Sequence, residues 1–228
     1  MPHGAGLIQL WGGGDIGLDA PPALVVLRLL GAQGRAELAT EDPANRLSGV
    51  GSAVWTLNPP GYGASSGPTT VRKYLSAAFA AYDYLAARYP RARMWVYGKS
   101  IGATAAIYLV AHRDLSGVIL KNAIDVPAIA RRRVTRWLPA RIGSWIAASV
   151  PSELSPTLWA PSGRCPALFV VSADDKVAPS DLQLHIAGLY GGPTVVLRVQ
   201  GGHDDRTLHA EDEVLYAEAV RALAAPSG

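Results

Sequence analysis

Short apolar runs alternate with longer helical stretches along the chain, and this alternation restricts the fold more than any other feature. Each run is almost continuously apolar, which is typical of strands buried on both faces of a parallel sheet. We therefore expect each run to form a buried strand. The runs occupy residues 23–30, 53–57, 94–97, 117–120, 167–171 and 195–199.

The stretches between these runs have the length and composition of helices. Residues 71–88 follow Thr70, which can cap a helix, and precede Pro90, which ends one. Strands that alternate with helices predict an α/β fold with a doubly wound, mostly parallel sheet. Right-handed crossovers then bring the loops after the strands to one edge, where ligands bind. The other predicted helices cover residues 103–112, 181–189 and 211–223.

The length of the chain suits one domain. It has 228 residues, 49% of them hydrophobic, and α/β units of this size commonly share one core. We therefore expect residues 1–228 to form a single domain. Residues 125–165 contain prolines and tryptophans but no clear strand, so they predict a small helical cap inserted into it. The residues before the first run leave room for a single hairpin over residues 7–19.

Composition excludes several classes of protein. Charged residues make up 17% of the chain, which excludes general disorder, and the net charge of +3 is too small to indicate a nucleic-acid partner. The single cysteine, Cys165, excludes an internal disulfide bond and a multi-cysteine zinc site. We expect a cytoplasmic protein, because the sequence has neither a signal peptide nor an apolar stretch of about 20 residues. The composition does not indicate the oligomeric state.

The motif Gly-Lys-Ser-Ile-Gly at residues 98–102 fits the pattern G-x-S-x-G between a predicted strand and a predicted helix. The glycines allow a sharp turn that holds the serine in a strained conformation above the sheet. The turn also directs the helix N-terminus, including the Ile101 N–H, at an oxyanion formed there. The motif therefore predicts Ser100 as a nucleophile and Ile101 as an oxyanion donor.

Two glycine-containing patterns resemble nucleotide-binding motifs but lack the necessary context. A P-loop requires a glycine five residues before its Gly-Lys pair, and that position is Arg93. The glycines at positions 12, 14 and 17 match the dinucleotide fingerprint, which should open a helix. Two prolines follow at positions 21 and 22 without a helical pattern. We therefore interpret this segment as a hairpin or loop.

A serine nucleophile needs a base and a group that orients the base. Asp174 and Asp175 follow the run at 167–171, and His203 follows the run at 195–199. His203 alone among the histidines has a glycine-preceded position after a strand. We expect structural or surface roles for the other histidines, which are His3, His112, His185 and His209.

Together with the segment Asn-Pro-Pro-Gly-Tyr-Gly-Ala-Ser at residues 58–65, these motifs make residues 23–222 similar to the α/β-hydrolase family. The chain resembles most closely its small bacterial serine hydrolases with a minimal cap. The resemblance implies Ser100 as nucleophile, His203 as general base and an aspartate as its orienter. The family places this acid three residues after a small residue and about four before a proline. Ser172 and Pro179 therefore favour Asp175 over Asp174.

The resemblance also implies a second oxyanion donor in the turn after the run at 23–30. The family often has a His-Gly pair there, and this chain has Leu30 in place of the histidine. A backbone N–H does not depend on that side chain. We therefore assign the second donor to Ala32, with Gln33 as the alternative.

These residues predict an enzyme that cleaves a carboxylic ester, or a related acyl bond, of a small molecule through an acyl-enzyme. The predicted mechanism requires no metal or organic cofactor. One alternative is an acyltransferase or thioesterase that uses the same residues. The other is a non-catalytic interaction protein that has kept the fold.

The start of the predicted cap is rich in arginine. Arg132 and Arg136 are four residues apart, so they share one helical face where they could clasp an acidic group of the substrate. Trp137 could then line the apolar part of the pocket. The alternative is a solvated surface whose arginine stems cover apolar neighbours.

Overall fold

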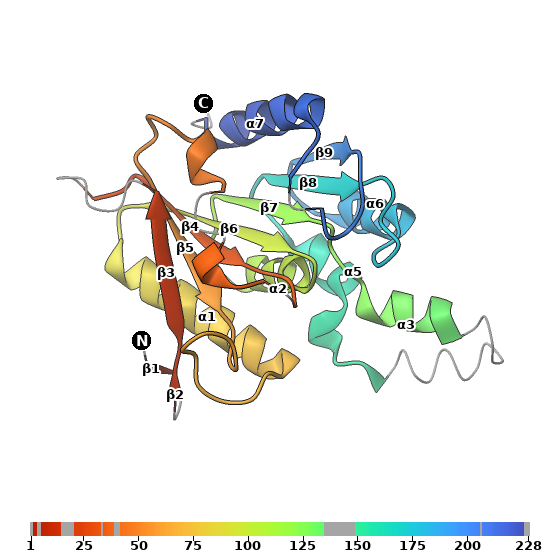
Figure 1. Cartoon of the computed structure of the whole chain (residues 1–228), viewed down its shortest axis with the longest axis horizontal. Helices are drawn as coiled ribbons and strands as arrows, with labels where there is room; N and C mark the ends of the chain where they lie inside the picture. Colours follow the sequence, from red (N-terminus) through yellow and green to blue (C-terminus); the bar gives the residue numbers. More distant parts are fainter. Residues whose placement is uncertain are drawn as a thin grey trace.

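A central sheet of seven strands runs through the computed structural model, which describes residues 2–3, 6–14, 21–32, 34–38, 42–134, 149–205 and 207–225 (Figure 1). The strand order is β3-β5-β4-β6-β7-β8-β9. β3 pairs antiparallel with β5, and the other neighbours pair in parallel. The strands are β3 (Gln9–Gly14), β4 (Leu24–Leu29), β5 (Ser52–Asn58), β6 (Arg93–Lys99), β7 (Gly117–Lys121), β8 (Ala167–Ser172) and β9 (Thr194–Val199).

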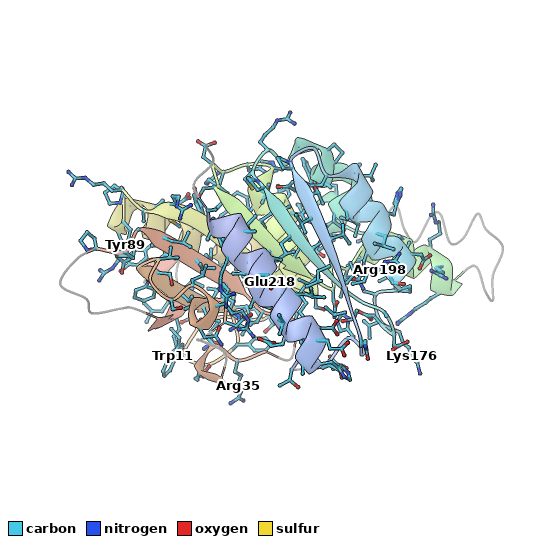
Figure 2. The ribbon with its side chains drawn as sticks, turned by 90° about the horizontal axis from the view of Figure 1, so that it is seen from above. Trp11, Arg35, Tyr89, Lys176, Arg198 and Glu218 are labelled. Carbon is cyan, nitrogen blue, oxygen red and sulfur yellow. The ribbon has the colours of Figure 1, made fainter. Side chains whose placement is uncertain are left out.

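Helices cover both faces of this sheet. α1 (Val71–Arg88), α2 (Ile101–Val110) and α6 (Ser180–Leu189) pack on one face, and α7 (Ala210–Ala224) packs on the other. Figure 2 shows α7 crossing its face diagonally, with the exposed Glu218 on the helix. Alternate residues of each central strand enter opposite cores, which explains why the apolar runs are continuous. This arrangement confirms the predicted doubly wound α/β fold.

Local signals predicted the helices well. α1 spans the predicted residues, and the Thr70 hydroxyl accepts a hydrogen bond from the Lys73 N–H at 3.2 Å, as expected of an N-cap. α2 begins at Ile101, two residues before the predicted start, because the sharp turn at Ser100 leads directly into it.

Both edges of the sheet differ from the prediction. β9 is an edge strand rather than a strand buried on both faces, and Val195 is 56% exposed. Of the hairpin predicted over residues 7–19, residues 9–14 form β3, which pairs with β5, and residues 15–19 lie outside the described residues. Gln9 anchors this pairing, since its side-chain carbonyl accepts a hydrogen bond from Asn58 Nδ2 at 2.9 Å. A small separate hairpin, β1 (Pro2–His3) with β2 (Gly6–Leu7), precedes it.

In the described residues, the segment between β7 and β8 consists of helices joined by loops and contains no strand. Its elements are α3 (Val126–Val134), η3 (Ser152–Leu154), α5 (Pro156–Trp159) and η4 (Ala160–Ser162). The remaining short helices of the described chain are η1 (Ala36–Leu38) and η2 (Ala44–Arg46). No helix in the described ranges combines the length and the apolar character needed to cross a membrane.

Candidate active site

Ser100 lies in the turn between β6 and α2, at the edge of the sheet where the parallel strands end (Figure 1). Its φ of 59° is a strained conformation for a residue with a side chain. The flanking glycines are sterically required. A Cβ atom on Gly98 would lie 2.5 Å from the Ala103 Cα, and one on Gly102 would lie 2.2 Å from the Leu29 carbonyl oxygen.

The structure brings the predicted serine, histidine and aspartate into direct contact. His203 Nε2 lies 2.8 Å from Ser100 Oγ, and His203 Nδ1 lies 2.6 Å from Asp175 Oδ2. The three residues follow β6, β8 and β9, so parallel strands place them at one edge. This geometry allows the imidazole to take a proton from the serine while the carboxylate fixes its tautomer.

Asp175 is buried and held by more donors than the sequence motif reveals. Its Oδ1 accepts hydrogen bonds from the backbone N–H groups of Val177 and Ala178 at 2.8 and 2.7 Å. Its Oδ2 accepts a third from Gln183 Nε2 on α6 at 3.3 Å. Asp174 is exposed instead. No local sequence pattern marks Gln183, because only the packing of α6 brings it to the carboxylate.

The loop of His203 is fixed by backbone geometry and side-chain acceptors. Gly201 has a φ of 94°, a backbone conformation that favours glycine, and a Cβ atom there would also lie 2.2 Å from Asp205 Oδ2. Asp205 Oδ2 also accepts a hydrogen bond from the Gly202 N–H at 2.7 Å. Asn122, a buried residue that the sequence did not single out, donates from Nδ2 to the His203 carbonyl at 3.4 Å.

The turn after β4 lies beside Ser100. A Cβ atom on Gly31 would lie 3.1 Å from the Ser100 Cβ, and the Gly31 carbonyl accepts a hydrogen bond from the Gly34 N–H at 3.0 Å. Ala32 is in this turn, whereas Gln33 lies outside the described residues. Ile101 is the first residue of α2, where backbone N–H groups have no partner within the helix. Both candidate oxyanion donors therefore belong to elements next to the serine.

Comparisons with known proteins identify the fold that carries this site. The structure superposes on Est1E from Butyrivibrio proteoclasticus with bound ferulic acid at a TM-score of 0.74, with 16% identity over 97% of this chain and 95% of that one. It superposes on the Pyrococcus furiosus esterase Pf2001 at 0.71, with 16% identity over 95% and 86% of the two chains. The chain is an α/β-hydrolase-fold protein.

One curated relative is similar in sequence to this α/β-hydrolase-fold chain. It is the alpha/beta hydrolase domain-containing protein aho-3 of Caenorhabditis elegans, with 29% identity over 176 residues. The match covers 75% of this chain and 48% of the relative, so the chain spans about half the relative's length. No protein-family model matches the chain.

Arg132 of the α/β-hydrolase-fold chain has a partner within the protein. Its Nη1 donates to both carboxylate oxygens of Asp181, at 3.0 and 2.9 Å, and its side chain is 54% exposed. This pair joins α3 to the first turn of α6. Arg136 and Trp137 lie outside the described residues. Contact of these three side chains with a substrate stays a prediction.

The other reactive side chains described in the fold lie in structural or surface positions. His112 Nδ1 lies 2.7 Å from the Tyr108 carbonyl, and its ring packs against Trp159. Cys165 is buried, and this burial raises the pKa of its thiol. His185 and His209 are exposed, and the side chain of His3 lies outside the described residues. In the described ranges, no group of three or more His, Cys, Asp or Glu residues is arranged to hold a metal ion.

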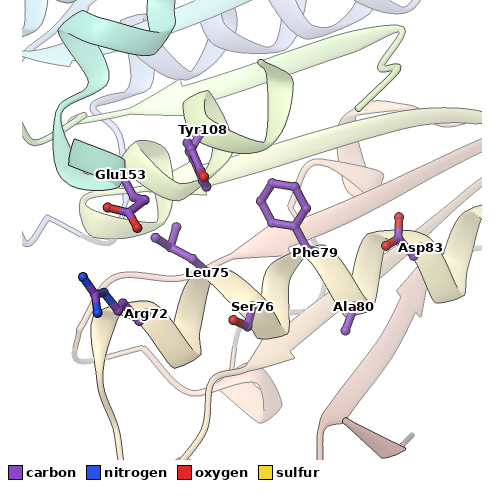
Figure 3. Close-up of a pocket in the computed structure, with 8 residues that line it drawn as sticks. All are labelled: Arg72, Leu75, Ser76, Phe79, Ala80, Asp83, Tyr108 and Glu153. Carbon is purple, nitrogen blue, oxygen red and sulfur yellow. The ribbon is translucent and has the colours of Figure 1, made fainter. Parts of the chain in front are cut away.

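A cavity of about 530 Å³ lies between α1, α2 and η3, apart from the residues around Ser100 (Figure 3). Phe79 and Tyr108 form its aromatic wall, and Arg72 and Glu153 lie together at one end. Asp83 at the other end is already paired with Arg113. The lining of this cavity contains none of the residues Ser100, Asp175 and His203.

Proposed function

We propose that this chain is a serine hydrolase that cleaves carboxylic esters by acyl transfer to water. The single observation behind this proposal is the hydrogen-bonded series in which His203 bridges Ser100 and Asp175, at 2.8 and 2.6 Å. An isolated serine in a tight turn would need neither partner. The esterase names of similar structures support the same reaction class.

In the acylation step, His203 Nε2 takes the proton of Ser100 Oγ as this oxygen bonds to the ester carbonyl carbon. The carbonyl π electrons move to oxygen and give a tetrahedral oxyanion. The imidazolium then returns the proton to the alkoxy oxygen as the ester C–O bond breaks. An alcohol leaves, and the acyl group remains on Ser100.

In the deacylation step, His203 takes a proton from water while the water oxygen bonds to the acyl carbon. The second oxyanion collapses, the bond from carbon to Ser100 Oγ breaks, and Oγ regains the proton from His203. A carboxylic acid leaves, and the enzyme returns to its starting state. Asp175 holds the imidazole in the reactive tautomer and stabilises its cationic form in both steps.

The backbone N–H groups of Ile101 and Ala32 donate to the oxyanion in this proposal. Ile101 opens α2, so the positive end of the helix dipole points at the same place. The Gly31 carbonyl is held by the Gly34 N–H, which restrains the peptide that includes the Ala32 N–H. Such donors need no metal ion to stabilise the developing charge.

Labelling with a fluorophosphonate probe tests the proposal directly, because the probe phosphonylates an activated serine. We expect the wild-type chain to be labelled at Ser100 and to hydrolyse a nitrophenyl ester, and Ser100→Ala to do neither. An unlabelled wild-type chain would overturn the proposal and favour an interaction protein. Product analysis with an added alcohol then separates transfer to water from transfer to that alcohol.

A further inference from the structure

The hydroxyl of Tyr74 on α1 reaches the turn beside Ser100. It donates to the carbonyl of Leu30 at 2.7 Å, across 44 positions of sequence. The Tyr74 side chain is buried, and burial raises the pKa of its hydroxyl far above the usual range. The hydroxyl therefore stays a proton donor at every pH at which the protein would be assayed.

Successive carbonyl groups of this turn each have a donor. The Leu30 carbonyl accepts from Tyr74, the Gly31 carbonyl accepts from the Gly34 N–H, and the Ala32 carbonyl accepts from the Tyr62 hydroxyl. In a trans peptide the N–H points away from the C=O. The first two bonds therefore set the directions of the Gly31 and Ala32 N–H groups.

The held turn also fits closely against the turn at Ser100. A Cβ atom on Gly102 would lie 2.9 Å from the Leu30 carbonyl oxygen, and one on Gly31 would lie 3.1 Å from the Ser100 Cβ. A shift of this turn by an ångström would therefore alter the distance from its amides to the serine. Misplacement on that scale costs about 100-fold in rate in well-studied enzymes.

We propose that Tyr74 is a positioning residue, whose hydroxyl holds the Leu30 carbonyl and so fixes the Leu30–Gly31 peptide. This peptide leads directly into the Gly31–Ala32 peptide, whose N–H points at the oxyanion formed on Ser100. This inference rests on the proposed function. The Tyr74 hydroxyl bonds to the backbone of the turn, and Tyr74 acts through that backbone.

The same helix provides a matched control in Tyr82. Tyr74 and Tyr82 are each 6% exposed. The Tyr82 hydroxyl donates to the carbonyl of Asp114, in the loop that leads into the start of β7. That loop lies at the edge of the sheet opposite Ser100, because parallel strands begin at one edge and end at the other. Each Tyr→Phe change thus removes one hydroxyl that donates to a backbone carbonyl and keeps the ring.

The experiment compares Tyr74→Phe, Tyr82→Phe and the wild type on a nitrophenyl ester, with active sites counted by fluorophosphonate labelling. We expect kcat per active site to fall about 10-fold in Tyr74→Phe, a part of what the loss of one oxyanion donor costs. KM should stay within about twofold, since the bond acts on the transition state. Tyr82→Phe should keep the wild-type kcat, and both variants should show a similar fall in Tm.

Inhibition by a trifluoromethyl ketone, which forms a tetrahedral oxyanion on the serine, gives a second readout. Its Ki should rise in Tyr74→Phe by the factor by which kcat/KM falls, whereas the Ki of the product carboxylate should not change. Equal kcat values in the two variants, or a loss confined to KM, would overturn the inference while the proposed function stands. A wild type that neither turns over the ester nor binds the probe would overturn both.

Discussion

At the scale of single residues, Ser100 has a positive φ of 59° that a serine adopts only under strain. Ser100→Ala keeps this strain but removes the nucleophile. We expect turnover of a nitrophenyl ester to fall by roughly 10³-fold or more, because the three residues act as a unit. Ser116→Ala is the control, since Ser116 Oγ donates to the Met94 carbonyl at the far edge of the sheet. Retained hydrolysis in a clean Ser100→Ala preparation would contradict the assignment.

The two neighbouring aspartates make a second prediction. Asp175 accepts from His203 and is buried, whereas Asp174 is exposed. Asp175→Asn should lower kcat by a factor on the order of 10⁴, because an amide at this place favours the wrong imidazole tautomer. Asp174→Asn should change kcat little. Steady-state kinetics of both variants test the ranking, and the reverse ranking would show that the acid is misassigned.

The contrast between these aspartates shows what spacing can predict. The positions of Ser172 and Pro179 selected Asp175 because the turn after β8 is local. Gln183 and Asn122 contact the same group of residues through α6 and the end of β7. No local spacing signals such contacts, because they arise only when distant elements pack. Sequence therefore predicts residues inside motifs better than the residues that hold them.

At the scale of elements, the exposed pair of Arg132 and Asp181 joins α3 to α6. An acidic substrate that binds Arg132 must compete with this carboxylate. We expect Arg132→Ala to lower kcat/KM for an acidic ester by a factor that corresponds to about 1.5–3 kcal/mol of lost binding free energy. The kcat/KM for a neutral ester of equal acyl length should not change. Asp181→Asn, which frees the guanidinium, should favour the acidic ester. Equal effects on both esters would instead make Arg132 a surface residue.

The edges of the sheet show why some elements escaped prediction. The central strands were identified because both of their faces are buried, which produces continuous apolar runs. β9 has a similar run, yet it lies at an edge and exposes Val195 and Val196. β3 is glycine-rich and has no continuous apolar run, and it becomes a strand because it pairs with β5. Edge position depends on pairing across the sheet, which local composition does not encode.

At the scale of the whole molecule, a group of partly buried charged side chains and buried tyrosines connects the loop before β5 to the α7 face. Asp42 lies within 3.9 Å of Arg28, accepts from Arg46 at 2.9 Å and lies 3.4 Å from the Tyr216 hydroxyl. The Arg28 guanidinium stacks 4.8 Å from the centre of the Tyr97 ring. These contacts link β4, β6, η2 and α7, so their loss should affect global stability.

Tyr97 gives this group a pH dependence of stability. Burial, followed by the charge of Asp42, raises the pKa of Tyr97 from 10.0 to about 12, although Arg28 opposes the shift. The unfolded chain therefore loses this proton first as the pH rises above 10. The contribution of Tyr97 is fully present below pH 10 and is lost as the pH rises through about 12. By then the loss amounts to roughly 2–3 kcal/mol of unfolding free energy.

Urea unfolding between about pH 9 and 11.5 tests this contribution in the wild type and in Tyr97→Phe. The variant keeps the ring against Arg28 but has no proton to lose, so its unfolding free energy should fall less steeply with pH. Burial also raises the pKa of Tyr216 well above 10.0, so the unfolding free energy of Tyr97→Phe should still fall somewhat as the pH rises. Tyr84→Phe, at a side chain that is 41% exposed, should follow the wild type. Parallel curves for all three proteins would mean that Tyr97 ionises equally in the folded and unfolded chains.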